Sequence, residues 1–298
     1  MKGAFESASA GKVTAGLGRV RVRLPLVREM GGNRKIWAAL AILGPILLLV
    51  LAAPFLSLPP PLETDVRSSL EPPSLKHPFG TDKLGRDVLS RTLAGFKVSL
   101  VVAFSVALIS LAFGITFGTL AGFLGRRVDQ IIMAVTDLFL AFPSLLLAIG
   151  LVAIVGAGTV PVILAIALAD VPRFIRLQRS LAFSLRSRAF IDAARTVQAS
   201  KWWIMRRHVI PNTIAPLLVA ASIAAANAIL IEASLSFLGL GITPPAPSLG
   251  NIIRDGQIYL QEAWWISGLP GLVILLVAIS LHFLSDGIRE ALDPKARK

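Results

Sequence analysis

Long runs of apolar residues alternate with short polar segments along most of the chain. Each run is long enough to cross about 30 Å of hydrocarbon with some tilt, so the pattern predicts six transmembrane helices. They cover residues 36–58, 96–124, 131–155, 160–177, 213–240 and 264–284. The cluster 59–61 is all proline and ends the first run, because proline cannot extend a helix. We therefore expect an all-α integral membrane protein.

Composition agrees with this expectation and narrows the chemistry. The chain is 55% hydrophobic and 16% charged, whereas a soluble domain would carry roughly 25% charged residues. It has no cysteine, which excludes disulfides, thiolate metal sites and cysteine nucleophiles. None of its three histidines, His77, His208 and His282, has a second histidine three or four residues away. We therefore expect none of the histidines to bind a metal or to act in catalysis. His77 is expected in a surface loop.

The basic residues predict the orientation of the chain. Its net charge is +13, and cytoplasmic loops of membrane proteins hold the excess of lysine and arginine. With both termini cytoplasmic, 23 of the 30 basic residues lie inside, including all those in 173–207. The orientation in the membrane thus explains the excess of basic residues. We expect membrane lipid as a partner and no nucleic acid.

This orientation divides the chain into five parts. They are a cytoplasmic leader (1–35), a first transmembrane helix (36–58), an extracytoplasmic segment (59–95), a five-helix core (96–287) and a cytoplasmic tail (288–298). The core contains the longest cytoplasmic loop, residues 180–212.

That loop predicts two short helices. The first runs through Asp192, Ala193 and Ala194. The second starts at Ser200, a favourable N-cap, and Pro211 is expected to stop it. The expected apolar stripe and its flanking aromatic and basic residues are Trp203, Ile204 and Val209 with Trp202, Arg206 and Arg207. Such a pair either lies on an anionic leaflet or docks on a cytoplasmic partner, and the residues alone do not decide between these.

Three acidic residues lie inside the apolar runs: Asp137, Asp170 and Glu232. Because a carboxylate in hydrocarbon is costly, such groups face the protein interior or a water-filled path. Glu232 lies beside small residues such as Ser236, so it is the first candidate for a translocation path, ahead of Asp137. The alternative for both acids is a structural hydrogen bond or ion pair.

Two shorter patterns concern packing and the outer face. Gly114, Gly118 and Gly122 form one helix face without side chains, which allows close helix packing. The alternative is a sliding surface between subunits. Residues 81–87 predict a short outer helix with an Asp82–Arg86 pair, which either seats the chain in the interface or helps to receive a substrate-binding protein.

Five stretches in the same order resemble the permeases of binding-protein-dependent ABC importers. They are residues 77–91, 137–147, 188–212, 232–241 and 286–294. In the loop, Asp192-Ala193-Ala194 followed by His208 and Pro211 is similar to the EAA loop of these permeases. The residues of this loop resemble those of the second permease subunit of the dipeptide, oligopeptide and nickel family. Two positions depart from that family, since Gln198 stands at a turn that usually holds glycine, and Asp192 replaces a glutamate.

This resemblance implies a type I importer permease in a prokaryotic cytoplasmic membrane. Its loop would dock on an ATPase subunit, and the implied partners are a second permease, two ATP-binding subunits and an extracytoplasmic binding protein. The chain has no Walker A motif, so ATP and Mg²⁺ are expected on the partners. Peptides are the implied solutes, with nickel chelates or oligosaccharides as alternatives. A membrane enzyme and a secondary transporter fit less well, since catalytic motifs and two related halves are lacking.

Overall fold

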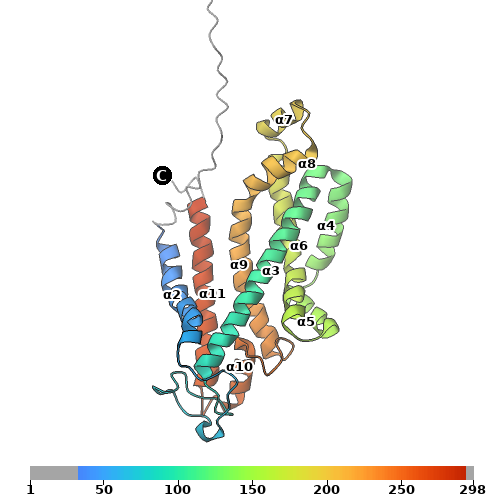
Figure 1. Cartoon of the computed structure of the whole chain (residues 1–298). Coiled ribbons are helices and arrows are strands. Elements are labelled where there is room, and N and C mark those ends of the chain that lie inside the picture. The colour runs from blue at the N-terminus through green and yellow to red at the C-terminus, as the bar shows by residue number, and fades with distance from the viewer. Residues whose placement is uncertain (1–32, 293–298) are drawn as a thin grey trace, which may run out of the picture.

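The computed structural model describes residues 33–292, which form a bundle of helices (Figure 1). The long helices are α2 (Arg34–Ala52), α3 (Val88–Leu124), α4 (Arg126–Leu140), α5 (Ser144–Val155), α6 (Thr159–Leu185), α9 (Ile210–Phe237) and α11 (Trp265–Leu292). The shorter helical segments are η1 (Ala53–Phe55), η2 (Val66–Ser68), α7 (Ala189–Thr196), α8 (Lys201–Ile204), η3 (Met205–Val209), α10 (Leu249–Gly256) and η4 (Gln257–Tyr259). The predicted leader, 1–35, lies almost wholly outside the described residues.

The bundle has two distinct ends (Figure 1). The α7 end carries α7 and α8, the start of α2, the junction of α3 with α4 and the last turns of α11. The α10 end carries α5, α10 and the segment 56–87. Asn33 and Lys35 both bond to Glu290 of α11, at 3.0 and 2.5 Å, and so tie the first described helix to the last. Both limits of the described chain therefore lie at the α7 end.

The number of membrane spans is confirmed only in a coarser form. Within residues 33–292, four helical stretches are long and apolar enough to cross a membrane: Arg34–Phe55, Val88–Leu124, Lys201–Phe237 and Trp265–Ala291. The pair α4 and α5 adds a fifth if it is a single bent span. The helix α6 does not join this set, because it carries Asp170, Arg173, Arg176 and Arg179.

The second and third predicted spans had wrong boundaries. The helix α3 begins at Val88 rather than at residue 96, because Asp87 caps it by accepting a hydrogen bond from the Ser90 amide at 2.7 Å. The predicted span 131–155 is broken, and α4 and α5 meet at an angle of 88°. Pro143 lies at this break, where it lacks an amide donor and disfavours helical geometry in the residue before it.

The fourth predicted span ended too early. The helix α6 continues to Leu185, eight residues beyond the predicted end at residue 177. Arg173, Arg176 and Arg179 therefore all belong to a long helix of the bundle, although the charge count placed them on the cytoplasmic side. This also weakens the charge count on which the predicted orientation rests, because it assigned all three to the inside.

The glycine face of α3 packs against α6 of the same chain. A Cβ on Gly114 would lie 2.4 Å from the Cβ of Phe174, and one on Gly118 would lie 2.7 Å from the carbonyl oxygen of Ile175. A Cβ on Gly122 would be 2.7 Å from the Arg179 carbonyl oxygen. No side chain fits at these positions, so this face is occupied within the chain and does not offer a sliding surface to another subunit.

The segment before α3 folds differently from the prediction. Residues 81–87 form a turn closed by an isolated bridge between Thr81 and Asp87, not a helix. The predicted pair is confirmed, with 2.7 Å between Arg86 Nε and Asp82 Oδ2.

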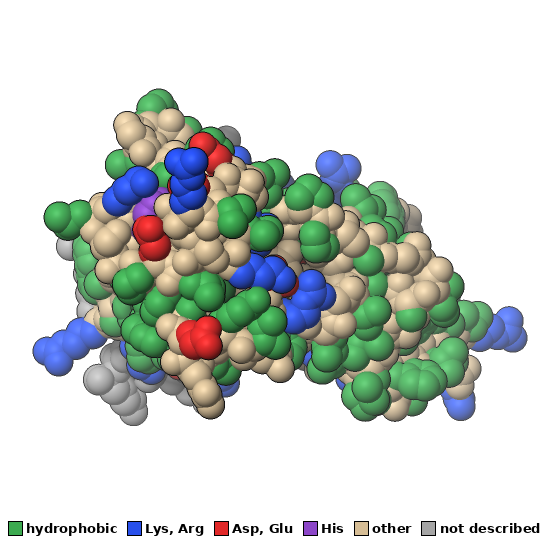
Figure 2. Space-filling view, turned by 90° about the horizontal axis from the view of Figure 1, so that it is seen from below, with side chains coloured by type: hydrophobic (Ala, Val, Ile, Leu, Met, Phe, Trp, Pro, Cys, Tyr) green, Lys and Arg blue, Asp and Glu red, His purple; other side chains and the backbone are tan. Residues whose placement is uncertain are grey.

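His77 is 5% exposed rather than at the surface, because its Nδ1 lies 2.9 Å from Asp87 Oδ2. Figure 2 shows the α10 end, where acidic and basic side chains lie among apolar ones.

Candidate functional site

The loop between α6 and α9 is a folded unit with its own apolar core. Its two predicted helices are confirmed as α7 and α8, and the Ser200 hydroxyl oxygen caps α8 by accepting a hydrogen bond from the Trp203 amide at 3.2 Å. The buried side of the loop packs against the ends of α3 and α6. This core consists of Ile191, Ala194, Ile204, Met205 and Val209 of the loop, with Phe123 of α3 and Ala182 of α6. The loop is thus held firmly on the bundle rather than hanging free from it.

The predicted docking residues fall into a buried and an exposed group. On α7, Ala194 is buried in this core, whereas Asp192 and Ala193 are exposed, and Asp192 accepts a hydrogen bond from Arg195 at 2.9 Å. Trp202 is 65% exposed. The loop therefore has one face packed on the bundle and another that presents Asp192, Ala193 and Trp202 outward.

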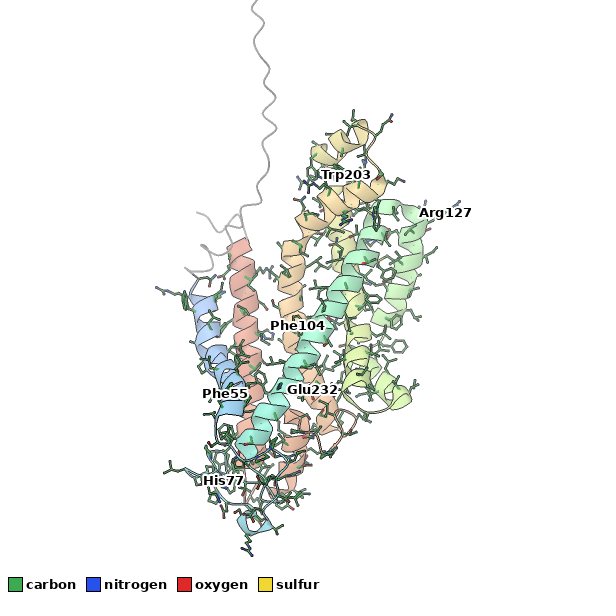
Figure 3. All side chains as sticks on the ribbon, viewed as in Figure 1. Phe55, His77, Phe104, Arg127, Trp203 and Glu232 are labelled. Atoms are coloured by element: carbon green, nitrogen blue, oxygen red, sulfur yellow. The ribbon has the colours of Figure 1, made fainter. Side chains whose placement is uncertain are left out.

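The predicted apolar stripe of α8 was partly wrong. Ile204 and Val209 are buried, but Trp203 is 48% exposed and packs edge-on against the ring of His208, with 5.1 Å between centroids (Figure 3). Arg206 and Arg207 are exposed beside them. Trp203 belongs to the outward face because the chain widens into the π-helical segment η3 directly after α8, which rotates the later residues relative to it.

Pro211 does not end this helix, contrary to the prediction. The helical stretch runs without a break from Lys201 to Phe237, through η3 and into α9. Pro211 occupies the first turn of α9, and the Ile210 amide bonds to the carbonyl of Met205, five residues earlier. The wider π turn accommodates the proline ring and its missing donor.

Gln198 adopts the left-handed backbone conformation that the family's glycine would adopt freely. Its φ is +56°, and its amide donates to the Arg195 carbonyl oxygen at 2.9 Å. A side chain in this region costs about 1 kcal/mol. The side chain also lines a cavity of about 320 Å³ between the loop and the end of α3, together with Phe123, Arg186 and Lys201.

Gln198→Gly is expected to fold and transport like the parent chain, with equal or slightly higher thermal stability. Relief of the left-handed strain offsets the greater chain entropy of glycine. Gln198→Val should lower the melting temperature, because a β-branched residue tolerates positive φ poorly. The measurement is thermal unfolding of both variants in detergent, and a less stable glycine variant would contradict this account of the turn.

Glu232 is fully buried between α3 and α9 (Figure 3). Its two carboxylate oxygens accept hydrogen bonds from Ser99 at 2.6 Å and from Ser236 at 2.9 Å. The Ser236 oxygen in turn accepts from the Ile242 amide at 3.1 Å. This geometry favours the structural alternative for Glu232 and Ser236, since both lie inside a hydrogen-bonded junction.

Asp137 lies in a very different setting. Its side chain is 57% exposed on α4, and its Oδ1 accepts a hydrogen bond from Arg176 Nη2 of α6 at 2.6 Å. A second pair joins the same helices near the α7 end, where Arg179 Nη2 donates to Asp129 Oδ2 at 2.6 Å. The sequence did not predict these ion pairs. The spacing of three residues between the arginines is typical of one helix face, and it indicates that the helix continues past residue 177.

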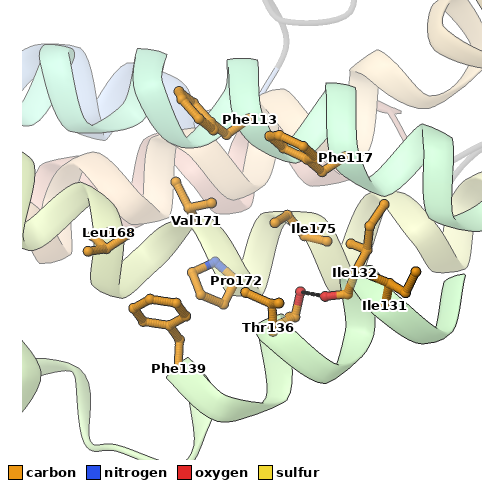
Figure 4. A pocket seen from close by; sticks show the side chains of 11 residues that line it. Phe113, Phe117, Ile131, Ile132, Thr136, Phe139, Leu168, Val171, Pro172 and Ile175 are labelled. Carbon is orange, nitrogen blue, oxygen red and sulfur yellow. Dashed lines mark hydrogen bonds between the residues drawn. The ribbon is translucent and has the colours of Figure 1, made fainter. Parts of the chain in front are cut away.

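An apolar pocket of about 330 Å³ lies between α3, α4 and α6 (Figure 4). Its lining residues are Phe113, Phe117, Ile131, Ile132, Val135, Thr136, Phe139, Leu168, Val171, Pro172 and Ile175. The one hydroxyl, on Thr136, already donates to the Ile132 carbonyl oxygen at 2.8 Å. The pocket therefore suits a hydrocarbon group and offers nothing to a charged solute.

Comparison with known proteins assigns the chain to a family. Residues 114–298 match the family described as "Binding-protein-dependent transport system inner membrane component". The chain belongs to this family. The match includes the glycine face, the loop with α7 and α8, and Glu232, so the predicted resemblance is confirmed.

Curated permeases resemble this permease over most of its length. A putative peptide transport system permease protein of Brucella abortus is 41% identical over 270 residues, which are 91% of each chain. The dipeptide transport system permease protein DppC of Alkalihalophilus pseudofirmus is 39% identical over 91% of this chain and 89% of that one. The glutathione transport system permease protein GsiD of Pectobacterium atrosepticum is 39% identical over 76% of this chain and 75% of that one.

A solved structure shares the fold. A chain of the MetNI methionine ABC transporter in an inward-facing conformation superposes with a TM-score of 0.55 at 18% identity. The match covers 69% of this permease and 97% of that chain. The fold is thus that of an ABC importer permease, as the sequence resemblance implied.

Proposed function

We propose that this permease forms half of the translocation path of an ATP-driven importer for di- or oligopeptides. The names of the similar permeases specify peptide, dipeptide and glutathione transport, and this supports a peptide cargo. The alternatives predicted from sequence are a nickel chelate or an oligosaccharide carried by the same type of transporter, or a secondary transporter. The names of these three similar permeases mention neither nickel, nor oligosaccharides, nor secondary transport.

In this proposal the chain crosses the membrane six times, with α4 and α5 as one bent span and α6 as another. The α7 end is cytoplasmic, and so are both termini. The polar half of α6 is tolerated because it packs on α3 and α4 and its remaining side faces the path enclosed with a second permease. The basic residues of the loop, with Arg126 and Arg127 at the start of α4, support this orientation through the positive-inside rule.

The observation that carries the proposal is the two-faced loop at the α7 end. One face is fixed on the bundle by the apolar core around Ile204, and the other presents Asp192, Ala193 and Trp202. A rigid mount with an exposed face suits the transmission of movement from an ATPase to the membrane helices. The chain itself is non-catalytic, and two partner subunits bind ATP and Mg²⁺ and hydrolyse the nucleotide.

The remaining partners are a second, homologous permease and an extracytoplasmic substrate-binding protein in a prokaryotic inner membrane. The test is uptake of a radiolabelled dipeptide into proteoliposomes that contain this chain with the proposed partners. Uptake should require ATP, and it should be lost when any one partner is left out. ATP-independent uptake driven by a proton gradient would contradict the proposal and favour a secondary transporter.

The path itself was predicted from sequence to include Glu232, Ser236 and Asp137. The burial of Glu232 and Ser236 argues for a structural role, while the exposed position of Asp137 supports a place on the path. Glu232→Gln is expected to assemble and transport normally, since an amide can still bond to both serines.

Glu232→Leu should destabilise the protein by about 1–3 kcal/mol, because it leaves buried hydroxyls without their acceptor. The measurements are thermal stability and dipeptide uptake per assembled complex for both Glu232 variants. Reduced uptake by Glu232→Gln at unchanged stability would instead return Glu232 to the path.

A further inference from the structure

Arg173, Arg176 and Ser180 form one exposed stripe on α6. At 100° per residue they lie within about 60° of one another around the helix axis. The side chains of Arg173 and Arg176 are 52% and 56% exposed, and Ser180 is exposed as well. The opposite side of α6, with Phe174 and Gln178, is buried against the glycine face of α3. The stripe therefore points away from the core of this chain.

The two arginines of the stripe lie far from the end of the bundle, measured along the helix axes. With a rise of 1.5 Å per residue, Arg176 is about 14 Å and Arg173 about 18 Å from the end of α6 at Leu185. Asp137, the partner of Arg176, is about 16 Å along α4 from Arg126, which lies at the same end. In the proposed six-span arrangement, with these ends of α4 and α6 at the membrane surface, the two helix counts place the ion pair near the middle of a hydrocarbon core of about 30 Å.

Exposed charges at this depth cannot face lipid. A charged side chain at the centre of a bilayer costs about 2.5–3.5 kcal/mol or more, so such residues face protein or a water-filled cavity. Asp137, Arg173 and Arg176 would all bear this cost together, since each is more than half exposed. The face they share must line either a subunit interface or an aqueous path.

Arg173 has hydrogen-bonding capacity left for a ligand. Its Nη1 lies 3.5 Å from Asp170 Oδ1, and its Nη2 lies 3.3 Å from the Ser144 hydroxyl, so both contacts are long. A guanidinium has five donors in a planar fork that matches a carboxylate. The neighbouring Arg176 adds a second guanidinium one turn away.

We propose that this stripe lines the solute path and that Arg173, with Arg176, binds the carboxylate group of a peptide in transit. The inference rests on the proposed function, because it takes a peptide as the cargo. Replacement of the water around a carboxylate by fixed guanidinium donors keeps its hydrogen bonds at a depth where bulk water is scarce.

The test uses the fact that the chain has no cysteine. Ser180→Cys gives a single thiol beside both arginines and leaves their charges intact. In the assembled transporter, built with cysteine-free partners in liposomes, the rate with anionic sulfonatoethyl methanethiosulfonate relative to the cationic trimethylammonioethyl reagent should be about tenfold higher for this thiol than for a free thiol in solution. Addition of Arg173→Gln and Arg176→Gln leaves Asp137 and Asp170 without their partners and should reverse the preference.

Leu164→Cys is the matched control. Leu164 is exposed on the opposite face of α6 and lies about as far from the start of the helix as Ser180 lies from its end, by the same rise per residue. Its thiol should react slowly with both reagents. If the Ser180→Cys thiol is equally unreactive, the stripe faces protein or lipid and the proposal is wrong.

Carboxylate recognition is tested in the same liposomes. Dialanine should slow modification of the Ser180→Cys thiol severalfold, and dialanine amide should not. Equal protection by both, or by neither, would contradict binding of the carboxylate. Uptake of dialanine by the unmodified transporter is measured in parallel, so a failure of the peptide-importer proposal is seen separately from a failure of this one.

Discussion

Gly118→Leu is expected to abolish stable folding of the bundle or to lower its melting temperature sharply. A Cβ at this position would lie 2.6 Å from the Gln178 Cβ and 2.7 Å from the Ile175 carbonyl oxygen. The second contact is with backbone, which cannot rotate away as a side chain can. Overpacking of a close interface typically costs 1–3 kcal/mol, and a leucine places several atoms in this gap.

Gly150→Leu provides the matched control for this prediction. Gly150 is also in a helix of the bundle, α5, but a Cβ there would meet no atom within 4 Å. This variant should keep or slightly raise stability, because leucine favours helix more than glycine does. Equal melting temperatures for the two variants would mean that α3 and α6 do not pack in the way described.

Ala193→Trp is expected to prevent capture of the ATPase and reduce uptake to background while the permease stays folded. Ala193 is exposed on α7, so a large side chain there meets no part of the bundle but enlarges the face proposed to dock. A loss of about 2 kcal/mol, the scale of one hot-spot contact, would lower the affinity about 25-fold. The measurement is co-purification of the ATPase with the permease.

Ala194→Trp should behave differently from its neighbour. Ala194 is 7% exposed and packs in the apolar core of the loop, so its replacement should lower the stability of the loop itself. A thermal shift for Ala194→Trp without one for Ala193→Trp would confirm the orientation of α7. Normal ATPase capture by Ala193→Trp would mean that the outward face of α7 does not dock.

The sequence predicted those features that local chemistry controls. Apolar runs located α2, α3, α9 and α11, and the capping preference of Ser200 located the start of α8. Family resemblance identified the loop because its motif lies within one continuous stretch, residues 188–212. Gln198 was recognised as standing at a turn that usually holds glycine, and its φ of +56° shows that this turn does adopt the left-handed conformation.

Features that depend on distant partners were missed. The partners of Arg176 and Arg179 were not predicted, since nothing in the sequence shows that Asp137 and Asp129 of α4 lie opposite them. His77 is buried because Asp87 folds back on it, a contact set by the turn between them. Glu232 attracted a functional interpretation because its partner Ser99 lies 133 residues away.

The most direct test of the coupling role is a cross-link from Ala193→Cys, the single thiol in an otherwise cysteine-free chain. A short bifunctional reagent should join this residue to the ATPase in the assembled transporter, with a yield that changes when ATP is added. If the thiol instead forms no link to the ATPase and is labelled by a reagent dissolved in the bilayer, the loop lies on the membrane and does not couple the two.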